Sequence, residues 1–138
     1  MRKHLSSLIM AFSLFGGIAS AAEIDPLSLR QSHVCTFVKQ DSLVNFERKI
    51  ADMNRTLRRV FSNTYCSRDG VFEGGDMLHA AVAYGAVDVA MYLVEELPEY
   101  QLTKVDSKGL TVTQWIEEQY PDYSPAVAIG QAINKRLK

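Results

Sequence analysis

Apolar residues recur every three or four positions along most of the chain, and this spacing constrains the fold more than any other feature. Val34, Phe37 and Val38 have it, which places them on one face of a helix over about 27–40. The same spacing predicts further helices over about 43–53, 57–63, 77–83, 87–97, 111–119 and 124–137. No segment has the strict alternation of apolar and polar residues that a half-buried strand needs. The sequence therefore predicts an all-α fold.

The breaks between these segments carry helix start and stop signals. Asp25-Pro26 begins the first helix, because a cap residue followed by proline suits the first helical position. Gly85 and Pro98 end later helices, and Ser124-Pro125 is expected to cap the last one. Short helices joined by tight breaks turn back on one another, so we expect a short stack of antiparallel helical hairpins.

The first 21 residues have the organisation of a secretory signal peptide. A charged start is followed by an apolar run over 5–18 and by the small residues Ala19-Ser20-Ala21. The alternative is a membrane anchor, but the run is shorter than the roughly 20 apolar residues that a spanning helix needs. Cleavage after Ala21 predicts one helical domain over 22–138, with N-terminal helices over 22–70 and hairpins over 71–138. The product is expected in the periplasm or outside the cell, soluble and not attached to a membrane.

Two cysteines, Cys35 and Cys66, lie in the mature part of the chain. An even cysteine count in an exported protein predicts a disulfide. Closing a loop of about 30 residues contributes roughly 3–4 kcal/mol in the chain-entropy model. The alternative is a metal site that adds His33 and His79, but the chain lacks the spacing typical of such ligands. No metal is therefore expected.

Charge is balanced overall but unevenly placed. The chain has 15 Lys and Arg against 16 Asp and Glu, so it lacks the basic excess of a nucleic-acid-binding protein. Basic residues gather between 48 and 68, and acidic residues dominate from 69 to 122. Arg55, Arg58 and Arg59 have the spacing of one helix edge, and they are the candidate interaction surface. The alternative is an ordinary solvated helix face.

Residues 74–94, GGDMLHAAVAYGAVDVAMYLV, resemble an ankyrin repeat. Leu78 and His79 match the repeat's Thr-Pro-Leu-His signature, and Asp76 takes the threonine position. Gly85 matches the glycine that ends the first helix. The resemblance implies a pair of antiparallel helices, in which His79 has a structural role and forms hydrogen bonds within and between repeats.

A second, weaker ankyrin-like start follows at 106–111. Gly109 lies 35 residues after Gly74, close to the repeat period of about 33 residues. Thr111 matches the turn, and with Gln114 it has the spacing of a capping box. The whole layout also resembles a small uncharacterised family of exported bacterial proteins. That family combines an early cysteine in a helix, a later cysteine before a glycine-rich turn, and a short ankyrin-like hairpin.

No motif for catalysis or cofactor binding is present. The chain has no nucleophile elbow and no glycine-rich phosphate loop, so no catalytic residue and no cofactor are expected. Small size, export and ankyrin-like hairpins predict a non-enzymatic module that binds a protein partner. In its most concrete form this is an inhibitor or immunity-type protein that binds an exported enzyme or effector. The alternatives are an enzyme with an unrecognised site, a homo-oligomer such as a dimer, or an accessory subunit of an envelope complex.

Overall fold

The computed structural model describes residues 26–138, and the regular structure in this range is helical, as predicted. The predicted signal peptide over 1–21 lies outside the described residues. The helices are α2 (Pro26–Lys39), α3 (Leu43–Asp52), α4 (Leu57–Asn63), α5 (Met77–Tyr84), α6 (Val87–Glu96), α7 (Glu99–Leu102), α8 (Val112–Gln119) and α9 (Ser124–Arg136). Within 26–138 the β structure is limited to an isolated bridge between Cys66 and Gly75.

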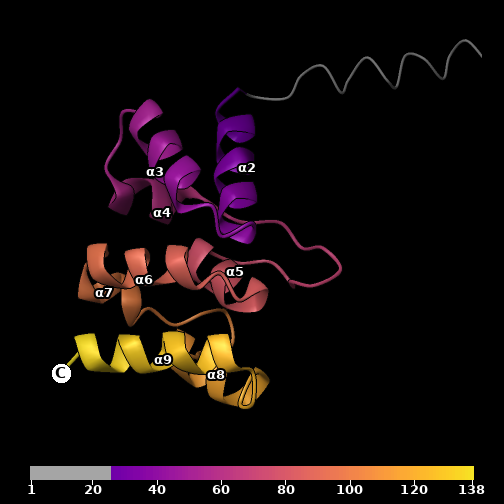
Figure 1. The fold of residues 1–138 in the computed structure, drawn as a ribbon, viewed down its shortest axis with the longest axis vertical. Helices are drawn as coiled ribbons and strands as arrows, with labels where there is room; N and C mark the ends of the chain where they lie inside the picture. Colours follow the sequence, from indigo (N-terminus) through magenta and orange to yellow (C-terminus); the bar gives the residue numbers. More distant parts are fainter. Residues whose placement is uncertain (1–25) are drawn as a thin grey trace, which may run out of the picture.

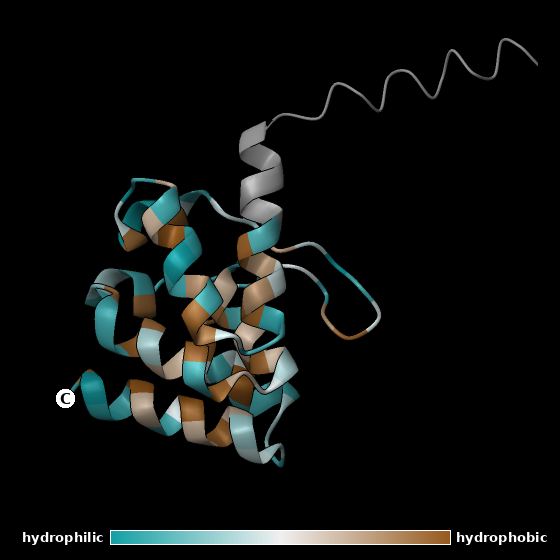
Figure 2. Cartoon of the chain, turned by 45° about the horizontal axis from the view of Figure 1, so that its top comes forward, coloured by the Kyte–Doolittle hydropathy of each residue, from teal (hydrophilic) through white to brown (hydrophobic). Residues whose placement is uncertain are grey.

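The helices form three stacked layers (Figure 1). Helices α2, α3 and α4 make the upper layer, α5, α6 and α7 the middle layer, and α8 and α9 the lower layer. The upper layer packs on the middle one through α2 on α5 and α3 on α6, and α9 packs beneath α5 and α6. Helix α9 carries hydrophobic residues among hydrophilic ones, as an amphipathic helix does (Figure 2), whereas most residues of the central helix α5 are buried.

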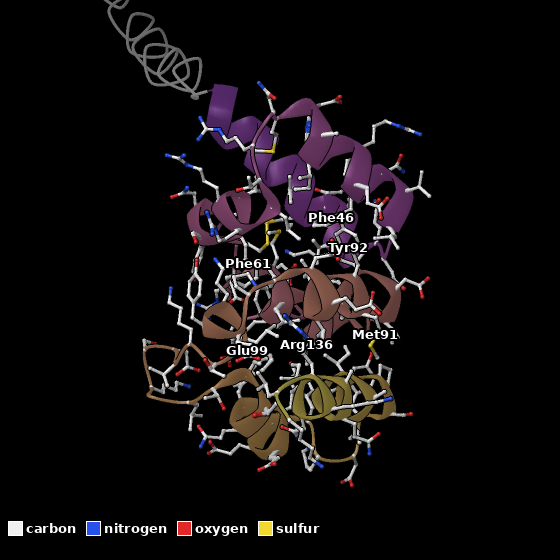
Figure 3. All side chains as sticks on the ribbon, turned by 90° about the vertical axis from the view of Figure 1, so that its left-hand side faces the viewer. Phe46, Phe61, Met91, Tyr92, Glu99 and Arg136 are labelled. Carbon is white, nitrogen blue, oxygen red and sulfur yellow. A yellow bond between two sulfur atoms is a disulfide. The ribbon has the colours of Figure 1, made fainter. Side chains whose placement is uncertain are left out.

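Side chains from neighbouring layers meet in one continuous hydrophobic core. Val34, Val38 and Phe46 of the upper layer are fully buried, as are Leu93 below them and Ile129 in α9. The ring of Phe46 packs edge-on against that of Tyr92, with centroids 6.0 Å apart, and Figure 3 shows this pair between the upper and middle layers.

Helix α6 is held at both ends by side chains from other layers. Its N-cap, Ala86, has no capping side chain. Asp41, in the α2–α3 turn, accepts a hydrogen bond from Val89 N at 2.9 Å. At the other end Arg136 of α9 (Figure 3) donates to Val94 O at 2.6 Å and to Leu97 O at 2.8 Å. An acid at a helix N-terminus and a base at its C-terminus are both favourable placements.

Two sequence expectations need correction, and one helix was missed. The short helix α7 was not predicted, because its four residues are too few to show a periodic pattern. Ser124 is the first residue of α9 and makes no side-chain cap, and the N-cap position belongs to Tyr123. Arg55 does not share a helix edge with Arg58 and Arg59. Helix α4 begins only at Leu57, after an extended N-cap residue, so Arg55 lies in the preceding turn.

Candidate functional site

The disulfide joins α2 to the segment that follows α4, as predicted. Cys35 and Cys66 are bonded, with their Cα atoms 5.5 Å apart. Both cysteines are thus used in the disulfide, which leaves neither of them as a thiolate ligand for the alternative metal site with His33 and His79. The Cys66 and Gly75 main chains exchange hydrogen bonds of 2.7 and 3.1 Å. These bonds close the base of a loop over 67–74 that projects from the stack (Figure 1).

Asp69 fastens this loop to the helices. Its Oδ2 accepts from Lys39 Nζ at 2.7 Å and from the Tyr84 hydroxyl at 2.5 Å. Its Oδ1 accepts from two main-chain N–H groups of the loop. The bond from Lys39, followed by those from Tyr84 and the main chain, lowers the pKa of Asp69 well below its usual range. The same contact with Asp69 raises the pKa of Tyr84.

A groove of about 1050 Å³ crosses the edge of all three layers, and we call it the main groove. Its walls come from the end of α4, the base of the loop, the start of α5, α7, the 104–108 turn and α8. Three large apolar side chains on these walls are exposed: Tyr65 by 69%, Tyr100 by 61% and Val105 by 53%. Such exposed side chains around a concavity are typical of a binding surface.

Asp76, His79 and Trp115 form a connected set on the wall of the main groove. Asp76 Oδ1 caps α5 by accepting from His79 N, and it also bonds the ring Nδ1, both at 2.8 Å. The ring of Trp115, in the next hairpin, lies 4.5 Å from that of His79. Nε2 of His79 has no hydrogen-bond partner among the described residues. His79 therefore contacts the next hairpin through its tilted ring contact with Trp115, and the hydrogen bond expected from His79 to the next repeat is absent among the described residues.

Three residues that line the main groove each have a side-chain atom that is buried from solvent and lacks a hydrogen-bond partner in the described chain. These atoms are His79 Nε2, Gln101 Oε1 and Thr64 Oγ1. Gln101 is 6% exposed and Thr64 5%. The Gln101 amide nitrogen donates to Arg58 O and to Ser62 Oγ at 3.1 and 2.8 Å, which leaves its oxygen as a free acceptor. A buried polar group without a partner costs roughly 1–3 kcal/mol.

The predicted arginines line a second concavity of about 800 Å³, the basic hollow. It is formed by Met53, Asn54, Arg55, Thr56, Arg58, Arg59, Ser62 and Tyr100. Ser62 and Tyr100 also line the main groove, so the two concavities adjoin. The structure thus brings Arg55, Arg58 and Arg59 together around one space, although one of them lies outside the helix.

The sequence did not indicate Tyr65, Tyr100 or Gln101 as site residues. Tyr100 and Gln101 lie on α7, whose four residues are too few for a helical pattern. Their neighbours in the site come from α4, about 40 residues earlier. No local signal carries such a pairing, because it depends on how the layers stack.

His79 and Thr64 both line the main groove, and their side chains are not hydrogen-bonded to each other. A hydroxyl nucleophile is activated by a hydrogen bond to its base. His79 has an orienting carboxylate, but neither its Nε2 nor Thr64 Oγ1 has a partner in the described chain, so the two do not bond each other. Separately, none of the helices in the described range is long and apolar enough to cross a membrane.

No curated protein and no solved structure matches the chain. A family model described as "Protein of unknown function (DUF3718)" matches residues 34–106. This range covers more than half of the chain and includes the disulfide, the loop, the basic hollow and most of the main groove. The chain therefore belongs to the DUF3718 family.

Proposed function

We propose that this chain is an exported, non-enzymatic interaction module that binds a protein partner in the main groove. The observation that carries the proposal is the exposure of Tyr65, Tyr100 and Val105 around one groove. A bound segment of the partner would remove these side chains from water. Tyrosines, and the arginines of the adjoining basic hollow, are side-chain types that dominate binding energy at protein interfaces.

Two further features favour this assignment. A disulfide persists in an oxidising compartment such as the periplasm or the cell exterior, which supports export. The stacked pairs α5–α6 and α8–α9 support an ankyrin-like architecture, in which hairpins present loops and a concave face to a partner. An inhibitor or immunity-type protein for an exported enzyme or effector is the most concrete form of this function.

The test measures the affinity of a purified partner for two matched double variants. The partner is first captured from envelope extract with the mature protein and then purified. Tyr65→Ala with Val105→Ala alters the main groove. Val44→Ala with Val71→Ala alters exposed apolar residues outside it. We expect the groove variant alone to bind about tenfold or more weakly, since removing an interface anchor commonly costs more than about 1 kcal/mol.

Equal affinity of both double variants for the captured partner would overturn the proposal, because the partner would then bind elsewhere. A self-associating wild-type protein, with an interface that the groove variant disrupts, would instead favour the homo-oligomer. Circular dichroism of all variants provides the folding control.

A further inference from the structure

The basic hollow carries positive charge that the described chain does not neutralise. Arg55, Arg58 and Arg59 line it, and none of its other lining residues is acidic. The ion pairs among the described residues are Lys39 with Asp69 and His79 with Asp76, so none of these arginines is paired. Like charges around one concavity repel, and an anion bound between them removes that repulsion.

The adjoining main groove has a different chemical character, because its exposed side chains Tyr65, Tyr100 and Val105 are largely apolar. Inorganic phosphate suits the arginines but would leave these side chains in water. A polypeptide with acidic and apolar side chains suits both concavities, because its carboxylates accept from arginine and its apolar side chains cover the exposed tyrosines.

We infer that the two concavities bind an extended, acidic segment of the protein partner. Its carboxylates lie in the basic hollow against the three arginines, and its main chain continues past Tyr100 into the main groove. Tyr100 stands where the concavities join, is 61% exposed, and offers its ring to a side chain of the segment. This inference rests on the proposed function and specifies the chemistry of the partner.

The test uses a fluorescein-labelled peptide of alternating glutamate and tyrosine, titrated with the full-length mature protein. Its matched control peptide has glutamine in place of each glutamate. We expect the acidic peptide to bind at least about tenfold more tightly than the control at low salt, with the difference shrinking as salt screens the charges. No binding of the acidic peptide, or equal binding of both, would overturn the inference.

Two triple variants of identical net charge locate the site. Arg55→Glu, Arg58→Glu and Arg59→Glu alter the basic hollow, and Arg68→Glu, Lys135→Glu and Lys138→Glu alter exposed positions outside both concavities. We expect only the first set to abolish binding of the acidic peptide. If it fails to fold, Arg55→Gln serves instead, because Arg55 precedes α4. Equal binding of the two variants would show that the charges act non-specifically.

Two controls follow. The first tests whether the basic hollow binds an anionic membrane surface in place of a peptide, and the second tests this inference separately from the proposed function. Binding to vesicles of anionic phospholipid without binding to the peptide would overturn it in favour of a membrane surface. If the captured partner binds the arginine triple variant normally but loses the Tyr65 and Val105 double variant, the inference fails and the proposed function stands. If neither variant affects the partner, both fail.

Discussion

The upper layer and the hairpins below it are stabilised by different kinds of contact. In the upper layer, α3 has no side-chain cap, and the disulfide joins residues separated by 31 positions. The hairpins instead have signals at their own ends: Asp76 caps α5, Gly85 ends it with a φ of 66°, and Thr111 begins α8 with a capping box. The upper layer therefore gains a covalent long-range bond, whereas α5 and α8 of the hairpins begin or end on local signals. Neither region relies on one kind of contact alone, because Thr56 caps α4 locally and Asp41 and Arg136 hold α6 from other layers.

The largest expected effect comes from removing the disulfide. Replacing Cys35 and Cys66 together by serine should lower the free energy of unfolding by about 3–4 kcal/mol, because the unfolded chain regains the entropy of an open loop. Native-state hydrogen exchange should show the loss first in α2 and at the base of the 67–74 loop, with α6 and α9 still protected. Loss of protection at the same rate in all three layers would show that the layers unfold as one unit.

The same contrast explains what the sequence could predict. Asp76, Gly85 and the Thr111–Gln114 capping box each stabilise a helix end within one turn of their own position. These helix ends could therefore be predicted from neighbouring residues in the sequence. Asp41 and Arg136 act on α6 from 48 and 42 residues away. An aspartate in a turn and an arginine near a helix end are common, and nothing local distinguishes these two.

The candidate site shows the same division between local features, which the sequence predicts, and long-range contacts, which it does not. Arg55, Arg58 and Arg59 are close in sequence, so their clustering was visible, although the start of α4 was not. The main groove was not predictable, because its walls come from segments of all three layers. Gln101 becomes a site residue only because α7 packs against α4.

An intermediate effect is expected at Gly85, where a local signal coincides with a long-range contact. Its φ of 66° is costly for other residues, and an added Cβ would contact the Tyr123 hydroxyl. Gly109 has a φ of 79° but open space around it. Gly85→Val should lower stability by about 2–3 kcal/mol, from backbone strain and overpacking together.

The matched pair Gly85→Ala and Gly109→Ala separates these two causes by thermal unfolding. Both variants carry the left-handed strain of about 1–2 kcal/mol, and only the first also meets Tyr123. Equal melting temperatures would show that the Tyr123 ring moves aside without cost and that the helix-end signal acts alone.

The smallest expected effect concerns Asp69, whose hydrogen bonds from Lys39 and Tyr84 join the 67–74 loop to α2 and to α5. The pKa of Asp69 is lowered in the folded protein, first by Lys39 and then by Tyr84. A carboxyl with a lowered pKa contributes stability above its unfolded pKa of about 3.9, and the contribution fades as the pH falls through the folded value. The pKa of Tyr84 is raised by the same bond, so that contribution is present below about pH 10 and is lost above it.

Asp69→Asn should therefore reduce stability at neutral pH and flatten its fall below about pH 4. Tyr84→Phe should remove the alkaline change that belongs to this bond and flatten the acid fall only in part, because Lys39 is the larger cause of the lowered pKa of Asp69 and stays in place. Denaturant unfolding across pH measures both variants. Asp106→Asn is the control, because the pKa of Asp106 is lowered mainly by the main-chain N–H of Leu110, which an asparagine oxygen still accepts. If Asp69→Asn and Asp106→Asn change the loss of stability below about pH 4 equally, the hydrogen bond between Lys39 and Asp69 adds no stability beyond the main-chain hydrogen bonds that Asp69 accepts within its turn. The disulfide and helix packing would then hold the loop without it.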